Sequence, residues 1–427
     1  MPFPEITRPG VCPGRNANGL GGIRPIGPTV PAGLHTARTA ATAKALALAM
    51  AFALTHTLAS AQTYLDTATA GEPYRIQGEY AGTVGTKPYG AQVIAWGNGK
   101  FEAVMLPGGL PGAGWGSKPT DFKSVTGNTS GSNTVFTTTG WSMVIKAGGA
   151  AIEGTGPDGA LKMTKVFRES ASLNWQGPAD AVKLFDGTQA TFKANWSSGS
   201  IKENAFLSEG SNSKTPFADH TLHLEFREPF EPLGDFQDRG NSGMYVQGRY
   251  EVQVLDSFGW MKGTNHGGAE GWAGGIYALK PGDFNMAFPP LRWETYDVWL
   301  TNAKFNGTTK TTNARITVWL NGIKVQDDVE LPGPTPGNYE GEAATGGKLA
   351  MQNHGAPLYF RNIWVVPGKQ VPIPATIKIV VPAQRKQPAR ASIFSADGAP
   401  YVDIRGAHRV AAPHGPFLML SAGEKRQ

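Results

Sequence analysis

Short runs in which hydrophobic and polar residues alternate recur through the first part of this chain. Two of them, Ala91–Gly97 and Lys100–Leu106, stand beside turns rich in glycine and proline such as PGGLPGAGWG. Successive side chains on a strand point to opposite faces, so this alternation is typical of half-buried β-strands. Short runs separated by turns at this spacing predict a small all-β module over residues 62–168.

The same pattern resumes beyond a connector at residues 169–179 and continues to about residue 366. The strand-like runs are TLHLEFREPF, SGMYVQG, RYEVQVLD, GGIYALK, RWETYDVWLT, ARITVWLNGIKVQD, KLAMQNHG and LYFRNIWVV, and none of adequate length has the helical period. Asn321-Gly322 lies between two alternating runs and predicts a tight hairpin, because both central residues of the favoured turn need positive φ. We therefore predict an antiparallel β-sandwich with two sheets over residues 180–367.

The N-terminal extension, residues 1–61, has the pattern of an export signal. Lys44 is followed by the apolar run Ala45–Leu54, and Ala59-Ser60-Ala61 fits the small-x-small rule for signal cleavage. The apolar run has about ten residues, too few for a transmembrane span. We expect cleavage after Ala61, which would remove the sole cysteine, Cys12, and a periplasmic or extracellular location for the mature protein.

The formal net charge of +6 is unevenly distributed along the chain. Residues 1–61 carry +4 and residues 369–427 carry +6, which leaves −4 for residues 62–368. A mildly acidic body argues against nucleic acid as the partner. We expect residues 368–427 to form a basic, partly disordered tail.

One strand of the second region carries polar side chains on a single face. Across residues 250–255, Glu251 and Gln253 share one face, whereas a tyrosine and two valines share the other. Gln352 and His354 share a face in the later run AMQNHG. One such residue on an exposed strand face is usually only solvated. Two strands that each present two of them predict a polar trough of the size of a sugar on one sheet face.

Further candidates stand on the neighbouring segments. Asp256 ends the strand that carries Glu251. Trp260 and Trp272 flank a glycine-rich stretch, where an indole ring could stack on a sugar. The remaining polar candidates for the same trough are Asn241, Arg249 and Arg361.

The spacing of acidic residues on this strand argues against ordinary glycoside hydrolysis. Such hydrolysis needs two carboxyl groups about 5–5.5 Å apart for retention of configuration, and wider for inversion. Sandwich glucanases that use a single strand carry acids at positions i and i+4. Here Leu255 stands at the second position and Gln253 between the two, so the strand supplies only one carboxylate.

Several motifs, in their order and spacing, resemble the 3-keto-glycoside hydrolase family, also described as 3-keto-glucoside 1,2-lyase and 3-keto-2-hydroxy-glucal hydratase. The resemblance covers about residues 180–366 and implies a concanavalin-like jelly-roll sandwich. The motifs are FDG, LHLEFR, NSGMYVQGRYEVQVLDSFG, GGIYAL, ITVWLNGIKV and MQNHGAPLYFRNIWV. Relative to shorter family members, this chain has two inserts, EPFEPLGDFQDR at Glu228–Arg239 and WMKGTNHGGAEGWAG at Trp260–Gly274, which leave the size of the substrate open.

The resemblance implies chemistry that needs only one base. In a 3-keto sugar the C2–H is acidic because the neighbouring carbonyl delocalises the carbanion, so one base can start an elimination at C1 that hydration completes. The resemblance implies His354 or Glu251 as the base and Asp256 as a metal ligand or orienting partner, with a divalent metal ion as candidate cofactor. It implies Gln253, Gln352 and Arg361 as hydrogen-bond donors to the enolate oxygen.

Two other functions compete with an exported enzyme that acts on carbohydrate. A lectin-like sandwich would bind carbohydrate without catalysis, since fold does not fix function. A structural envelope protein would use the β-rich first module and the basic tail. An enzyme needs an acid or base in the trough, whereas a lectin needs mainly aromatic and amide side chains. Glu251, Asp256 and His354 favour the enzyme.

Overall fold

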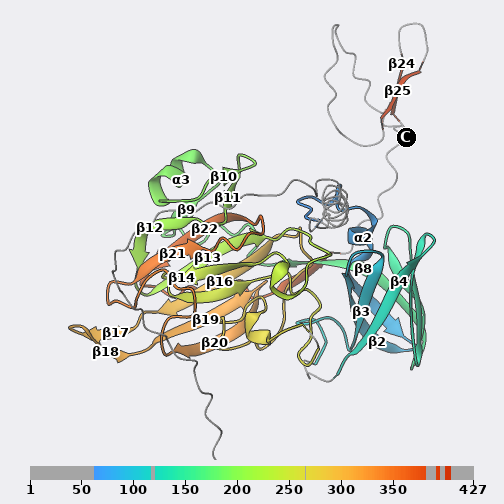
Figure 1. The fold of residues 1–427 in the computed structure, drawn as a ribbon, viewed down its shortest axis with the longest axis horizontal. Helices are drawn as coiled ribbons and strands as arrows, with labels where there is room; N and C mark the ends of the chain where they lie inside the picture. The colour runs from blue at the N-terminus through green and yellow to red at the C-terminus, as the bar shows by residue number, and fades with distance from the viewer. Residues whose placement is uncertain (1–61, 117–120, 265, 381–390, 395–399, 405–427) are drawn as a thin grey trace, which may run out of the picture. The chain divides into compact units, whose positions relative to one another are not determined.

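The computed structural model describes residues 62–116, 121–264, 266–380, 391–394 and 400–404 (Figure 1). Most regular structure in these ranges is β-strand, which confirms the predicted all-β fold class. The predicted signal segment and most of the predicted basic tail lie outside the described residues. Within the described ranges, no helix is long and apolar enough to cross a membrane.

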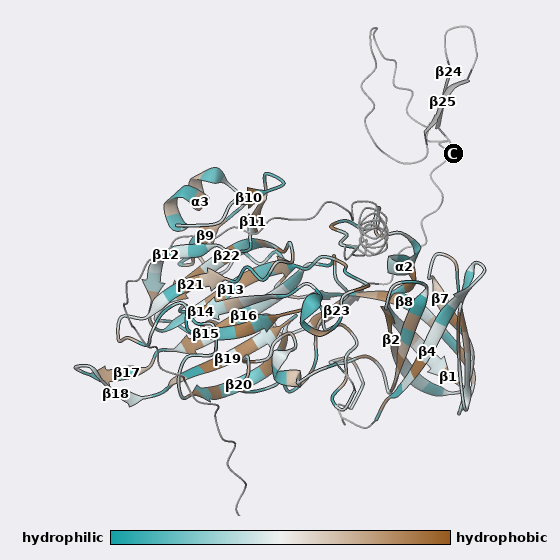
Figure 2. Cartoon of the chain, in the orientation of Figure 1, coloured by the Kyte–Doolittle hydropathy of each residue, from teal (hydrophilic) through white to brown (hydrophobic). Residues whose placement is uncertain are grey.

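The first strands form a closed antiparallel barrel. Consecutive strands pair in order, and β1 also pairs with β8, so closure removes the open edges of the sheet. Hydrophobic residues alternate with polar ones along these strands (Figure 2), and Tyr80, Val93, Phe136 and Met163 are among those that fill the core. The elements are helix α2 (Gly71–Ile76) and strands β1 (Gly78–Val84), β2 (Lys87–Ala95), β3 (Lys100–Pro107), β4 (Lys123–Ser130), β5 (Asn133–Thr138), β6 (Trp141–Lys146), β7 (Ala151–Gly156) and β8 (Gly159–Ser170).

Two further antiparallel sheets follow. The larger has the strand order β10-β11-β22-β13-β16-β19-β20, with β9 paired to β22, and the smaller has the order β12-β21-β14-β15. Their strands are β9 (Val182–Phe185), β10 (Ile201–Lys202), β11 (Phe206–Ser208), β12 (Asn212–Phe217), β13 (His220–Arg227), β14 (Ser242–Val246), β15 (Tyr250–Val254), β16 (Glu294–Thr301), β19 (Ala314–Leu320), β20 (Ile323–Leu331), β21 (Gly347–Met351) and β22 (Tyr359–Pro367).

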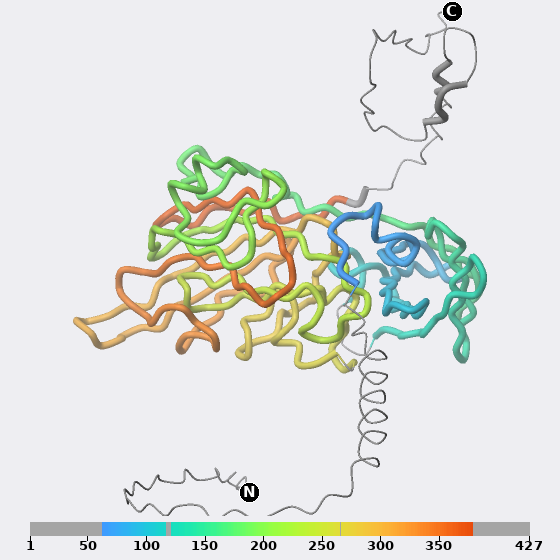
Figure 3. Tube along the Cα trace, turned by 45° about the horizontal axis from the view of Figure 1, so that its top comes forward, coloured from blue at the N-terminus to red at the C-terminus, as the bar shows by residue number. Residues whose placement is uncertain are grey.

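Short elements connect or follow these strands. They are α3 (Gln189–Asn195), η1 (Phe236–Asp238), η2 (Ala269–Gly271), β17 (Lys304–Asn306), β18 (Thr309–Thr312), β23 (Ile377–Val380), β24 (Ala391–Phe394) and β25 (Pro400–Ile404). Strand β23 pairs with β8 of the barrel, and the orange-red end of the trace in Figure 3 shows this return.

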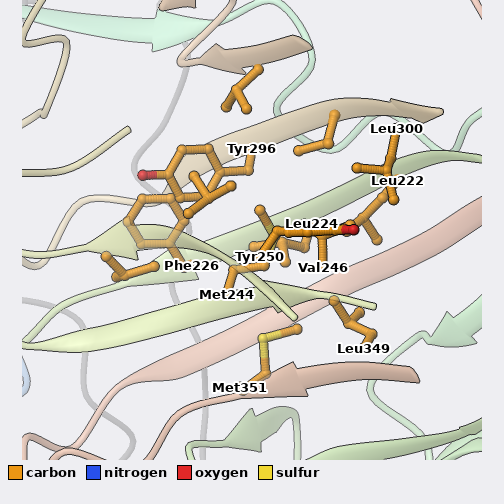
Figure 4. Close-up of a cluster of buried hydrophobic side chains, with 14 of the residues drawn as sticks. Leu222, Leu224, Phe226, Met244, Val246, Tyr250, Tyr296, Leu300, Leu349 and Met351 are labelled. Atoms are coloured by element: carbon orange, nitrogen blue, oxygen red, sulfur yellow. The ribbon is translucent and has the colours of Figure 1, made fainter. Parts of the chain in front are cut away.

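The two sheets pack face to face as a sandwich. Leu222, Leu224 and Phe226 of β13 meet Met244 and Val246 of β14 in one buried cluster (Figure 4). The packing confirms the antiparallel sandwich expected from the strand pattern and agrees with the jelly-roll that the resemblance implies. The predicted hairpin is also present, because β19 and β20 pair around Asn321 and Gly322, whose φ angles are +54° and +80°.

The barrel contacts the sandwich domain at its two inserts. Ile94 and Leu106 of the barrel lie in one buried apolar cluster with Phe258, Trp260 and Trp272. The inserts therefore provide a surface on which the first module packs.

Candidate active site

A polar trough lies on the face of the smaller sheet that points away from the sandwich core. It consists of a pocket of about 120 Å³ around Glu251 and an adjoining pocket of about 420 Å³. Gln237, Asn241 and His354 line both pockets. The other residues of the smaller pocket are Tyr245, Glu251, Gln253, Tyr277, Pro336, Gly337 and Gln352.

The strand period explains how β15 contributes to this trough. Tyr250, Val252 and Val254 point into the sandwich core, so the intervening Glu251 and Gln253 must point to the other face. The predicted polar face of this strand is therefore the wall of a real pocket.

Glu251 is buried but makes few polar contacts. Its side chain is 98% buried, at 2% exposure, and its Oε2 accepts a hydrogen bond of 2.6 Å from the Tyr245 hydroxyl. Among the described residues no lysine or arginine forms an ion pair with it. Burial raises the pKa of Glu251 to about 7, and the Tyr245 hydrogen bond opposes this only in part. A carboxyl group with that pKa can act as a base near neutral pH.

Gly243 makes the space that the Glu251 carboxyl group occupies. A Cβ atom at residue 243 would lie 2.1 Å from Glu251 Oε1. Gly243 pairs with Gln253 across β14 and β15, so its lack of a side chain is what lets the carboxyl group lie over the neighbouring strand. The glycine of the Asn-Ser-Gly motif thus has a direct steric role in the site.

Gln253 has an unsatisfied acceptor in the pocket. Its Nε2 donates to Asn241 Oδ1 at 3.0 Å and to Gln237 Oε1 at 3.2 Å. Its Oε1 is buried and has no hydrogen-bond partner within the described part of the chain. A buried acceptor without a partner is costly, so a ligand hydroxyl or a water molecule would stabilise it. The predicted role of Gln253 as an oxygen donor is corrected to that of an acceptor, because its N–H groups are already used.

Gln352 and His354 approach the trough from the loop after β21. The backbone N–H of Gln352 donates to Gly243 O at 2.8 Å, and the Ser242 hydroxyl donates to Gln352 O at 2.8 Å. Gln352 Nε2 lies 3.5 Å from the Tyr245 hydroxyl, and His354 is exposed where the two pockets meet. The structure therefore brings together five of the predicted residues, namely Asn241, Glu251, Gln253, Gln352 and His354.

Two predicted charged residues, Asp256 and Arg361, lie outside the trough, and each forms an ion pair with another residue. Asp256 does not line the trough, and its Oδ2 accepts hydrogen bonds from the buried Arg239 at 2.8 and 3.2 Å. A carboxylate neutralised by a guanidinium is poorly suited to bind a metal ion. Among the described residues, no group of three or more aspartate, glutamate, histidine or cysteine residues could hold one. Arg361 lies on β22 of the larger sheet and pairs with Glu225 at 2.7 Å.

Three further predictions are corrected by burial. Arg249 donates to Gly346 O at 2.5 Å and so ties a turn at the end of the smaller sheet. Arg249 lies in the loop of residues 247–249 between β14 and β15 and does not line the trough. Trp260 and Trp272 are 0% and 4% exposed and pack in the apolar cluster against the barrel. They line a separate pocket of about 50 Å³ and not the trough.

The sequence prediction missed Tyr245, Gln237 and Tyr277. Tyr245 lies directly opposite Glu251 in the register of β14 and β15, so pairing the two runs around Gly248 would have found it. Gln237 comes from the first insert and Tyr277 follows the second. Neither has a local pattern that signals a site.

The barrel supports the insert that carries Gln237. Arg239 Nη1 donates to the carbonyl of Ala95 at 3.4 Å, and its guanidinium lies 5.0 Å from the ring centre of Trp96. Gly97 packs so closely on Leu233 that a Cβ there would lie 2.3 Å from the Leu233 side chain. The first module thus holds one wall of the trough.

Comparisons with known proteins agree with the resemblance. Residues 180–366 match the family model described as a 3-keto-alpha-glucoside-1,2-lyase-like domain. No curated protein matches the chain. The family match confirms the resemblance drawn from the motifs over residues 180–366.

Three solved structures from Parabacteroides distasonis are also similar, each titled as a candidate glycosyl hydrolase. One is 29% identical, with 45% of this chain and 85% of that chain covered and a TM-score of 0.39. Another is 16% identical, with 44% and 94% covered and a TM-score of 0.33. A third is 19% identical, with 41% and 90% covered and a TM-score of 0.27.

Proposed function

We propose, from the match of residues 180–366 to the 3-keto-alpha-glucoside-1,2-lyase-like family, that this protein cleaves 3-keto-glycosides by elimination followed by hydration. Glu251 is the general base in this proposal. The observation that carries it is a buried carboxyl group with a raised pKa, open to a pocket lined by amide, phenol and imidazole groups. The cleavage pattern of residues 59–61 supports action after export.

The proposed reaction needs one carboxylate at the carbon that loses a proton. Glu251 takes the proton from C2, and the electron pair of that bond delocalises onto the oxygen of the C3 carbonyl. The enolate then reforms the ketone, a double bond forms between C1 and C2, and the C1–O bond breaks. The departing oxygen takes up a proton. Water adds its oxygen to C1 and a proton to C2, so the net reaction is hydrolysis.

The neighbours of Glu251 suit the remaining tasks. Gln352 and His354 are the nearest candidates to donate to the C3 oxygen or the leaving oxygen, because both line the pocket. The unsatisfied Oε1 of Gln253 would accept a hydrogen bond from a sugar hydroxyl. Asp256 and Arg361 have no role in the proposal, because Asp256 is paired with Arg239 and Arg361 is paired with Glu225.

The pocket contents favour elimination over two-acid hydrolysis. Within the described residues, Glu251 is the one carboxylate that lines the smaller pocket. Glu231, Asp235 and Asp238 line the adjoining pocket. Glu231 already accepts hydrogen bonds from Thr63 and from the backbone of Gly240. Asp235 and Asp238 are exposed, and neither lines the pocket that holds Glu251.

Release of p-nitrophenol from p-nitrophenyl 3-keto-glucosides tests this proposal. We expect release by the wild-type protein with residues 1–61 removed, and none from the unoxidised glucosides, which lack the C3 carbonyl. Parallel assays with a chelator report any need for a divalent metal. If no anomer of the keto sugar is cleaved while sugar binding is measurable by calorimetry, the lectin function replaces the enzyme.

A further inference from the structure

A second pocket, which we call the seam pocket, lies between the barrel and the segment that precedes β16. It has a volume of about 390 Å³, within the range of about 300–1,000 Å³ that is usual for small-molecule sites. Tyr74, Gln77 and Lys165 line it from the barrel side, and Phe288 and Arg292 line it from the sandwich side. It shares no lining residue with the trough.

The charges around the seam pocket leave an excess of positive charge. Lys165 Nζ donates to the backbone carbonyls of Arg75 and Gln77 at 2.5 Å each. Burial lowers the pKa of Lys165 to about 7, and a bound anion would favour its protonated form. The Arg292 guanidinium stacks on Phe167 at 4.7 Å, and its nearest carboxylate oxygen, on Glu169, is 3.9 Å away. An anion would therefore be attracted to this pocket.

The other charged pair in the seam pocket is already balanced. Arg168 forms a buried ion pair with Glu79 at 2.5 Å, and its Nε donates to the second oxygen of Glu79 at 2.7 Å. Gln92 Nε2 donates to the same carboxylate at 3.0 Å. Glu79 is thus fully occupied and does not offset the charges of Lys165 and Arg292.

Gln77 adds a buried donor without a partner. Its Oε1 accepts a hydrogen bond of 2.8 Å from the Ala95 backbone N–H, which fixes the orientation of the amide. Its Nε2 is buried and has no hydrogen-bond partner within the described ranges. Since a buried donor left unpaired is costly, a ligand oxygen at this position would stabilise the protein.

The seam pocket also has apolar walls, which include Val166, Phe288 and Pro289. Arg75 lines it too, but its guanidinium is paired with Glu72 at 2.7 Å. We propose that the seam pocket binds an organic anion with an apolar body, its carboxylate or sulfonate group lying near Lys165, Arg292 and the Gln77 amide. Such a ligand contacts barrel and sandwich at once, and so it stabilises their packing. This site does not depend on the function proposed for the trough.

A matched pair of fluorescent probes tests the proposal. 1-Anilinonaphthalene-8-sulfonate and N-phenyl-1-naphthylamine have the same aromatic body, and only the first carries a charge. We expect the sulfonate to bind the wild-type protein at least about tenfold more tightly than the amine, as one charge-assisted hydrogen bond implies. Equal binding of the two probes, or no saturable binding of the sulfonate, would overturn the proposal.

Two variants assign binding to the seam pocket. Lys165→Met is expected to weaken sulfonate binding about tenfold or more and to leave amine binding within about twofold. Lys162→Met, which changes an exposed lysine of the same strand, is the matched control and is expected to have no effect. Thr67→Trp changes an exposed residue at the pocket wall and should weaken both probes by obstruction. Unchanged sulfonate binding in both Lys165→Met and Thr67→Trp contradicts the proposal. If one of the two variants does not fold, unchanged binding in the other contradicts it.

Discussion

Glu225 and Glu251 lie on opposite sheets of the sandwich, and both are buried, at 0% and 2% exposure. Glu225 accepts hydrogen bonds from the Asn174 backbone at 2.5 Å, from Asn362 at 2.9 Å and from Arg361 at 2.7 Å. Glu251 accepts one, from Tyr245. Burial alone therefore does not distinguish these two carboxylates. Glu225 has a charge partner, whereas Glu251 has none among the described residues and lines the pocket.

The pKa values of the two groups move in opposite directions. Burial acts to raise the pKa of Glu225, but hydrogen bonds from His223 and Asn362 and the charge of Arg361 hold it below its usual value. For Glu251, burial prevails and the pKa rises to about 7. We interpret Glu225 as a structural residue and Glu251 as the base.

Replacing the Glu251 carboxyl group by an amide has the largest expected effect. Glu251→Gln is expected to lower kcat by about 10²–10⁴, the usual contribution of a general base, and to leave the midpoint of thermal unfolding unchanged or higher. Glu330→Gln, at an exposed position of β20, is the control and should retain full activity. Full activity in Glu251→Gln would mean that another group takes the proton.

Removing the cation partner of Glu225 should affect stability and not chemistry. Arg361→Met removes one of the two cations beside the buried Glu225 carboxylate and leaves only His223, and we expect a loss of about 2–4 kcal/mol in the free energy of unfolding. Urea denaturation measures it. The control Arg315→Met breaks exposed ion pairs with Asp328 and Glu330 and should cost less than about 1 kcal/mol. A fall in kcat of the folded Arg361→Met protein would restore Arg361 to the site.

The pH dependence of stability should differ between wild type and Glu251→Gln. Because folding raises the pKa of Glu251 from 4.5 to about 7, the folded state retains a proton that the unfolded chain loses in this window. The wild type should therefore lose about 2–3 kcal/mol of stability relative to the variant as the pH rises from about 4.5 to 7. Denaturation curves at several pH values measure this, and parallel curves for the two proteins would contradict the raised pKa.

Removing the Tyr245 hydroxyl gives the smallest expected effect. The hydrogen bond from Tyr245 lowers the pKa of Glu251, so Tyr245→Phe should raise that pKa further. The acid limb of kcat/KM against pH, expected near pH 7 in the wild type, should move upward by about one unit. At high pH the variant should approach wild-type activity. An acid limb that stays in place would show that Glu251 does not control it.

The alternation of residues in β15 was sufficient to predict which side chains of this strand face the trough. That reasoning does not extend to Arg249, because Gln247 and Gly248 adopt positive φ angles of +58° and +63° in the loop before β15. It also could not tell that Arg361 stands on the other sheet, since alternation defines faces within a strand and not which strands are neighbours. Pairing partners depend on contacts far apart in the sequence.

The inserts were the least predictable part of the molecule. Trp260 and Trp272 have the composition of a sugar-stacking surface, but they pack with Ile94 and Leu106 of the barrel. That role depends on a second module whose packing no local pattern specifies. Gln237 lies in the other insert and reaches the trough because the barrel supports that segment.

The most direct test of Glu251 as the base follows the C2 proton itself. A 3-keto-glucoside deuterated at C2 is incubated with the wild-type protein and with Glu251→Gln, and loss of deuterium from C2 is followed by mass spectrometry and NMR alongside release of the aglycone. We predict that the wild type loses the deuterium as it releases the aglycone and that Glu251→Gln does both at least a hundredfold more slowly. Release of the aglycone with deuterium retained at C2, or equal rates in the two proteins, would contradict the account.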